Sequence, residues 1–391
     1  MQLARIQEAL RERGIDGWLC CDFRNRDGLA YGVLGLDFGK LSTRRWYYFI
    51  PAKGAPRKLV SAVEEHRLDA LPGAARVYLS WKELHAGLKR LLGAKKRIAM
   101  QYSPLNNVPY VSVVDAGTVE LVKRLGHKIV SSADLVQIFV ALIGPEGYRT
   151  HKEAGAAVDR IRAEAFARIG AAVRSGNGAT EYDIQQYIMR RFDEEGLVTD
   201  SPPMVGTNER PADPHFDLTR ANTRSFAHGD TVLLDLWAKR NVPGAIYYDI
   251  TWCGFIGTPP AKYVEIFDVV RRARDAAVAF VADRFAAGAA CRGWEVDDVC
   301  RGVVKKAGYG KFFRHRTGHS IGEETHGNGV NIDNLETKDE RALMPGCCFS
   351  IEPGIYLPGE MGVRTEVDVF IRDDGTPEVT GEIQRELVKI A

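Results

Sequence analysis

The chain has 391 residues, of which 45% are hydrophobic and 27% are charged. These values are typical of soluble globular proteins and exclude collagen-like, disordered and membrane-spanning classes. The 53 lysines and arginines nearly balance the 51 aspartates and glutamates, so the sequence predicts no broad positive field for nucleic acid or anionic lipid. The length exceeds what one hydrophobic core usually supports, and we expect two domains.

The amino-terminal segment and the cysteines indicate a cytoplasmic protein. Leu3, Ile6 and Leu10 lie on one helical face among charged residues, unlike the apolar region of a signal peptide. No apolar run approaches the ~18 residues of a membrane span. The seven cysteines are odd in number and lack CxxC spacing, so we expect neither a disulfide framework nor a thiolate zinc site. A reducing compartment fits this pattern best.

The first third of the chain mixes short helical and extended patterns. It contains a helix near 2–13 and strand-like runs at 18–21, 46–50 and 97–102. This alternation predicts a small α/β domain over residues 1–143.

From residue 144 onward the pattern changes to longer elements. A long amphipathic helix begins after Pro145 and is closed by Gly176, and a second helix follows with Thr180 and Asp183 at capping-box spacing. Strand-like and helical blocks then alternate, with strands at 231–238, 246–257, 347–357 and 363–375 and helices near 261–285 and 295–307. These blocks predict an α+β domain over residues 144–391, built on a mostly antiparallel sheet.

Four acidic residues interrupt these strand-like segments. They are Asp235, Asp249, Glu352 and Glu366. A single acid of this kind is more often exposed or salt-bridged. Four buried carboxylates in one domain repel one another and coexist only if cations lie between them. The stretch HRTGHSIGEETHG adds imidazoles as nitrogen ligands, at His315, His319 and His326. Together these residues predict a divalent-metal site.

The same stretch permits another interpretation. GHSIG at 318–322 matches the GxSxG nucleophile elbow, with Ser320 as the nucleophile. That elbow follows a buried apolar strand and requires a histidine well downstream of the serine. Here KFFRHRT precedes it and no histidine follows His326, so we prefer the metal site.

Five ordered segments resemble the creatinase/prolidase/methionine-aminopeptidase superfamily, which has the pita-bread fold. They are LLDL at 235, YYDIT at 249, GHSIGEETH at 319 and 326, SIEPGIY at 352 and GVRTE at 366. The resemblance covers the whole second domain and implies a pita-bread catalytic domain after a creatinase-N-like α/β domain. The presence of the first domain favours prolidases and aminopeptidases P over methionine aminopeptidases.

The resemblance also implies how metals are held. Asp235 would bind one ion, His319 and Glu352 the other, and Asp249 and Glu366 would bridge the two. An oxygen-rich set with one imidazole favours Mn²⁺, with Co²⁺ or Zn²⁺ as alternatives. The two ions would convert a shared water into a bridging hydroxide that attacks the peptide carbonyl. Glu352 would move the proton, and Thr251 would orient Asp249.

Further residues gain roles from the same resemblance. His326 would stabilise the tetrahedral intermediate or position the residue after the scissile bond. His215, in PADPHFD, would line the pocket, with a roleless loop histidine as the alternative. His315 and Arg364 match positions near the family site, and either could be structural.

The function implied is hydrolysis of the Xaa–Pro bond of a small peptide by a homo-oligomer, most simply a dimer. The alternatives are a metal-dependent hydrolase of another amide or ester and a noncatalytic pseudo-peptidase that binds its ligand.

Three departures from the family pattern stand out. The hairpin between Asp235 and Asp249 is longer than usual, HGNGVNID lacks the arginine that holds a dipeptide's carboxylate in H-E-x-P-R, and Trp252 replaces a frequent arginine.

Overall fold

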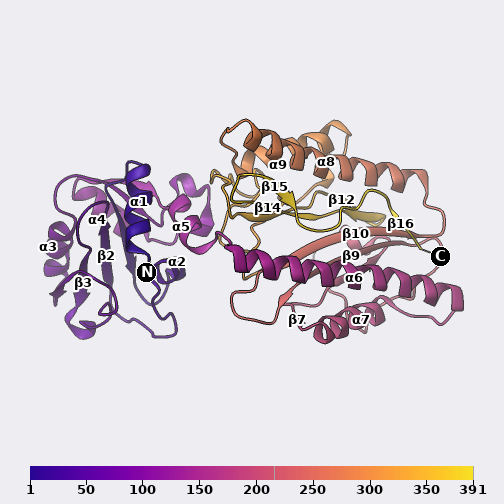
Figure 1. The fold of residues 1–391 in the computed structure, drawn as a ribbon, viewed down its shortest axis with the longest axis horizontal. Helices are drawn as coiled ribbons and strands as arrows, with labels where there is room; N and C mark the ends of the chain where they lie inside the picture. Colours follow the sequence, from indigo (N-terminus) through magenta and orange to yellow (C-terminus); the bar gives the residue numbers. More distant parts are fainter. Residues whose placement is uncertain (215, 391) are drawn as a thin grey trace. The chain divides into compact units, whose positions relative to one another are not determined.

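The structure is a computed structural model that describes residues 1–214 and 216–390. The chain divides into two compact units, Met1–Ala141 and Leu142–Ala391, drawn as a ribbon in Figure 1. In the part that the structure describes, no helix is both long and apolar enough to cross a bilayer. All seven cysteines are buried and free.

The first unit is a mixed sheet with helices packed against it. Its elements are α1 (Leu3–Glu12), β1 (Gly17–Asp22), α2 (Gly28–Leu34), β2 (Trp46–Pro51), β3 (Arg57–Ser61), β4 (Ala74–Tyr78), α3 (Trp81–Leu92), β5 (Arg97–Met100), α4 (Ala116–Arg124), β6 (Lys128–Ser131) and α5 (Ala133–Val140). The six strands lie in the order β4-β3-β2-β1-β5-β6, with parallel and antiparallel pairs. Helix α1 buries Ile6 and Leu10, the apolar face expected from the sequence.

The second unit carries the long helices and two groups of strands. Its elements are α6 (Pro145–Ser175), α7 (Glu181–Glu194), β7 (Leu197–Val198), β8 (Met204–Thr207), β9 (Thr231–Arg240), β10 (Tyr248–Ile256), α8 (Ala261–Ala286), α9 (Gly293–Lys306), β11 (Cys348–Ile351), β12 (Gly354–Leu357), β13 (Met361–Arg364), β14 (Val367–Ile371), β15 (Pro377–Val379) and β16 (Val388–Ile390). Gly176 ends α6 in the left-handed conformation, which glycine adopts without a steric penalty. Thr180 and Asp183 form the predicted capping box of α7.

The strands of the second unit lie between two layers of helices. A sheet of order β16-β10-β9-β7, with β8 also paired to β9, packs against α6. Strands β11, β14 and β15 form a second sheet, and β12 pairs with β13. Figure 1 shows α6 and α7 on the side of β9 and β10, and α8 and α9 on the side of β12, β14 and β15. The predicted α+β class is confirmed.

Candidate active site

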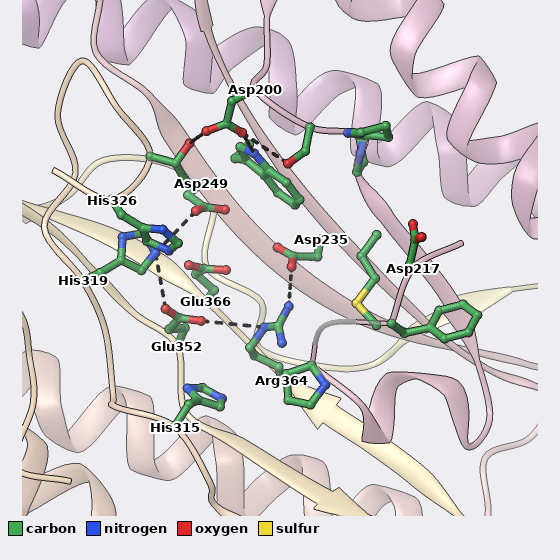
Figure 2. A pocket seen from close by; sticks show the side chains of 18 of the residues that line it. Asp200, Asp217, Asp235, Asp249, His315, His319, His326, Glu352, Arg364 and Glu366 are labelled. Carbon is green, nitrogen blue, oxygen red and sulfur yellow. Dashed lines mark hydrogen bonds and ion pairs between the residues drawn. The ribbon is translucent and has the colours of Figure 1, made fainter. Parts of the chain in front are cut away.

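The second unit contains a cavity of about 560 Å³. Its lining includes every site residue that the sequence predicts within the described part of the chain, namely Asp235, Asp249, His315, His319, His326, Glu352, Arg364 and Glu366. Figure 2 shows these side chains converging from several elements. The remaining predicted residue, His215, lies outside the described residues.

Strands β9 and β10 place the two aspartates. Thr251 of β10 lies opposite Asp235 of β9, and Asp249 lies two residues before Thr251. Since side chains alternate along a strand, these three residues share one face. Their neighbours Leu234 and Ile250 belong to the core beneath α6. The alternation of apolar and polar residues thus directs both carboxylates away from that core.

The two glutamates do not lie within strands, and the prediction that they do was wrong. Glu352 falls between β11 and β12, and Glu366 falls between β13 and β14. Pro353 has no N–H to continue a strand ladder. The backbone N–H of Glu352 donates to Thr317 O at 2.8 Å, and that of Glu366 donates to Thr251 O at 3.1 Å. These bonds to other segments hold both glutamates at the cavity.

A glycine allows the histidine loop to reach the same place. A Cβ on Gly318 would lie 1.9 Å from Ser350 O, so only glycine lets the loop lie against β11. The backbone of the neighbouring His319 is held through both its N–H and its carbonyl. Its N–H donates to Ser350 Oγ at 3.0 Å, and its carbonyl accepts from Ser350 N at 2.9 Å.

Four predicted metal ligands lie close together. One side-chain atom from each of Asp249, His319 and Glu366 lies within 4.8 Å of the others. His319 Nε2 is 3.6 Å from Asp249 Oδ2 and 3.4 Å from Glu352 Oε1. The group is buried, with Asp249, His319 and Glu366 each at most 5% exposed.

The fifth predicted ligand, Asp235, makes different contacts. Arg364 forms a direct ion pair with its carboxylate. Arg364 Nε also lies 3.9 Å from Glu352 Oε2 and donates to Thr251 Oγ1 at 2.9 Å. This guanidinium compensates part of the negative charge of the cluster but does not contact Asp249.

Thr251 does not orient Asp249, contrary to the sequence prediction. Its Oγ1 lies 3.0 Å from Asp235 Oδ1 and 2.6 Å from Glu366 Oε2. Side chains two apart on a strand point the same way without meeting, whereas cross-strand partners lie close. A hydroxyl has one hydrogen and donates to one carboxylate at a time. Thr251 therefore links Asp235 to Glu366.

Burial and mutual repulsion govern the protonation of the cluster. Burial, reinforced by neighbouring carboxylates, raises the pKa of Asp249 and of Glu366 well above the usual range. Burial also raises the pKa of Glu352 to about 7, against the opposing charges of Arg364 and Arg316. For His319, burial lowers the pKa well below its ordinary value, so the imidazole is neutral and has a lone pair for a cation.

The donor set fits divalent cations. Among the described residues, Asp249 Oδ1 and Glu366 Oε1 are buried oxygens without a hydrogen-bond partner. Buried polar atoms of this kind require an explanation, and an ion is one of the established ones. Carboxylate oxygens with one imidazole nitrogen suit hard or borderline metals.

Two histidines outside the ligand set line the cavity, His315 and His326, and their surroundings differ. The exposed His326 has its ring 4.4 Å from that of His319, at an interplanar angle of 81°, and lines the cavity. His315 lies 2.6 Å from Arg316 O through Nδ1 and 2.6 Å from the Tyr356 hydroxyl through Nε2. A carbonyl only accepts, so hydrogen-bond logic assigns the proton to Nδ1. Both nitrogens of His315 are thereby used.

His315 supports Arg364 through the hydroxyl of Tyr356. Burial lowers the pKa of His315 to about 3, so Nε2 accepts from the Tyr356 hydroxyl. The Tyr356 oxygen in turn accepts from Arg364 Nη1 at 3.1 Å. This chain of bonds fixes Arg364 beside Asp235.

Ser320 does not occupy a nucleophile elbow. It is 3% exposed, and its Oγ accepts from Gly329 N at 3.0 Å. An isolated bridge to Phe349 and turns flank it, where the elbow has a strand and a helix.

Several lining or supporting residues were not predicted. Asp368 Oδ2 accepts from Asp249 N at 2.8 Å. Its position among valines in VDVF is the same signal that identified the other acids. Asp200 accepts from Trp237 Nε1 at 2.7 Å and from Thr325 Oγ1 at 3.0 Å (Figure 2). Asp200 lies on an exposed loop, where the sequence carries no comparable signal.

Known proteins resemble this chain in sequence. The model for "Metallopeptidase family M24" matches residues 149–373, more than half of the chain. A probable dipeptidase PepE of Mycobacterium tuberculosis is 33% identical over 228 residues, covering 58% of this chain and 55% of the relative. An Xaa-Pro dipeptidase of Lactobacillus helveticus is 32% identical over 231 residues, covering 59% and 57%. The chain spans about half the length of the curated relatives it matches.

Solved structures share the fold along the chain. A dipeptidase from Pyrococcus horikoshii matches with a TM-score of 0.59 and 26% identity over 99% of both chains. Dipeptidase PepE from Mycobacterium ulcerans matches with a TM-score of 0.65 and 24% identity, covering 100% of this chain and 97% of that one. The pita-bread fold implied by the sequence is confirmed. With its acidic, histidine-containing cavity and a family match over more than half its length, the chain belongs to metallopeptidase family M24.

Proposed function

We propose that this chain is a metal-dependent peptidase that cleaves the bond before proline in dipeptides and other short peptides. The observation that carries the proposal is the buried group of Asp249, His319 and Glu366, with two oxygens that lack partners among the described residues, in a cavity of about 560 Å³. The family match and the relatives named as Xaa-Pro dipeptidases support it.

Five residues would hold two divalent ions, which we propose to be Mn²⁺. Asp235 would bind one, His319 and Glu352 the other, and Asp249 and Glu366 both. When bound, such ions acidify a water molecule and polarise a carbonyl. Asp235 would leave its ion pair with Arg364 and bind the ion. Thr251, which contacts both Asp235 and Glu366, would hold these two carboxylates in place.

Glu352 is the residue that we propose to move the proton. Its Oε1 lies beside His319 and accepts from Ser350 Oγ at 3.2 Å. It would take a proton from water and deliver it to the leaving nitrogen of proline. The nearby Arg364 keeps the carboxylate from turning away from the cavity.

His326 would act on the substrate and not on the metals. We expect His326→Ala to retain bound metal and to lower kcat by about 10²–10³-fold, the usual cost of losing a donor to the oxyanion. Steady-state kinetics together with metal analysis checks this. His228→Ala, at a histidine outside the cavity lining, is the control. Loss of metal from His326→Ala would instead indicate that His326 is a metal ligand.

Arg316 would replace the arginine that the sequence lacks after His326. It is half-buried in the cavity lining, and its backbone N–H donates to Glu336 Oε1 at 3.1 Å. A guanidinium binds a free carboxylate with charge-assisted bonds. We propose that it holds the carboxyl end of a dipeptide.

Arg316→Gln should raise KM for Xaa-Pro dipeptides by about ten-fold, the loss of one charge-assisted bond. The KM for carboxamide-capped dipeptides should stay the same, because they carry no terminal charge. Arg314→Gln, at an exposed arginine nearby, is the matched control. Equal effects on free and capped substrates would assign Arg316 a structural role.

Product analysis tests the proposed function as a whole. Purified chain with Mn²⁺ would be incubated with Ala-Pro, Ala-Ala, Ala-Pro-Ala and a non-peptide amide. We expect release of the residue before proline from the proline-containing peptides. Turnover of the amide alone would make the chain a different hydrolase, and tight binding without turnover would make it a pseudo-peptidase.

A further inference from the structure

A second cavity lies in the same unit, apart from the one described above. Its volume is about 460 Å³, within the range of small-molecule sites. It is lined by the α6 segment from Arg162 to Arg174, by Trp252 of β10 and by residues of β16. Figure 1 shows α6 running beside β10 and β16. None of these lining residues lines the first cavity.

Arg162 and Trp252, which both line this second cavity, each carry a buried donor atom without an acceptor. The Arg162 guanidinium stacks over the Trp252 ring, 3.5 Å from its centroid. Arg162 is only 4% exposed, and among the described residues neither its Nη1 nor Trp252 Nε1 has a hydrogen-bond partner. Buried N–H groups normally find an acceptor. Both side chains can only donate, so the missing partner is an oxygen-bearing group or water.

The charge at the cavity is positive. Arg162 lines it together with the exposed Arg174 and Lys389, and none of the described residues in its lining is acidic. Two acids outside the lining pair with Arg162 Nη2. Glu382, whose side chain is 63% exposed, lies at 2.6 Å, and the buried Asp159 lies at 4.0 Å. Within residues 1–214 and 216–390, no ion pair involves Arg174 or Lys389. An anion at this site therefore has cations to bind without displacing existing pairs.

The rest of the lining is apolar. Phe166, Val388 and Ile390 lie beside small residues of α6, including Ala167 and Gly170. Small residues leave the space that the aromatic and aliphatic side chains enclose. A ligand that only carried charge would leave this apolar surface in water, whereas one with an apolar body would cover it.

We propose that this cavity binds a small amphipathic anion. Its apolar body would lie against Phe166 and Ile390, and its carboxylate or phosphate head would lie among Arg162, Arg174 and Lys389. The site is separate from the catalytic cavity, because Trp252 and Thr251 are consecutive on β10 and their side chains leave opposite faces of the sheet. The proposal is therefore independent of the proposed peptidase activity.

Calorimetric titration of the full-length chain at low ionic strength tests the site. The probes are octanoate, octyl phosphate, inorganic phosphate and octanol. We expect one saturable site per chain that binds octanoate or octyl phosphate at least about ten-fold more tightly than octanol. The preferred head group distinguishes a carboxylate from a phosphate. Inorganic phosphate should bind weakly, because it leaves the apolar lining uncovered.

Variants of the lining test whether the anion binds in this cavity. Arg174→Gln with Lys389→Gln should weaken the preferred anion by at least about five-fold, and Ala167→Trp, at an exposed position of the lining, should block it. Arg168→Gln, on the same helix but outside the lining, is the matched control. Octanol binding as tightly as the anions, or unchanged affinity in both cavity variants, would overturn the proposal.

Discussion

Asp249→Asn should abolish peptidase activity and bound metal while leaving the fold intact. Asp249 is 5% exposed, and its Oδ1 has no partner among the described residues, so its charge is tolerable only with a cation beside it. We expect activity to fall by at least about 10³-fold, or about 4 kcal/mol of transition-state stabilisation. Steady-state kinetics and metal analysis of the purified variant measure both effects.

The same substitution should not destabilise the chain when a chelator is present. Burial and the carboxylates of Glu366 and Asp235 raise the pKa of Asp249 well above its usual range, so the ionised acid is unfavourable in the metal-free fold and a neutral asparagine avoids that cost. The melting temperature in chelator should match or exceed that of the original chain. Asp373→Asn, at an exposed aspartate of the same unit, is the control. Full activity of Asp249→Asn would contradict its role as a ligand.

Adding Mn²⁺ to chelated protein should raise the melting temperature markedly. An ion that binds only the folded state stabilises it by about 2.7 kcal/mol at 100 times its dissociation constant, which shifts the melting temperature of a domain of this size by about 5–10 °C. The source of this effect is relief of repulsion among Asp249, Glu352 and Glu366. Differential scanning calorimetry with and without Mn²⁺ measures it.

Two variants test whether the shift in melting temperature comes from metal bound at the proposed site. Asp249→Asn should show little of the shift, because it removes one of the ligands that we propose both ions share. The control Asp373→Asn should show all of it. An unchanged melting temperature in Mn²⁺ and in chelator would mean that the buried carboxylates are neutralised by protons alone.

Much of the second unit follows from local sequence rules. Helix α6 begins at Pro145 and ends before Gly176, as its pattern predicts. The aspartates of β9 and β10 were found because an acid among alternating apolar residues is rare and costly to bury. These features depend on residues close together in the sequence.

The features that were missed depend on contacts between distant segments. The breaks at Glu352 and Glu366 arise from hydrogen bonds to Thr317 and Thr251. The partners of Thr251 and the pairing of Arg364 with Asp235 depend on how separate strands are brought together. No single-sequence pattern encodes such pairings.

Residues at the rim of the cavity were also missed by the sequence analysis. Arg316 and Asp200 lie on connections without strand or helix periodicity, so neither was predicted. Trp252 was noted as a departure from the family pattern, but its stacking with Arg162 became apparent only when α6 was seen beside β10.

The most direct test is anomalous diffraction from crystals grown with Mn²⁺. We expect two manganese peaks between the carboxylates of Asp235, Asp249, Glu352 and Glu366, one of them beside His319 Nε2, with Arg364 withdrawn from Asp235. Density that shows no manganese and Arg364 still paired with Asp235 would contradict the metal-centred site.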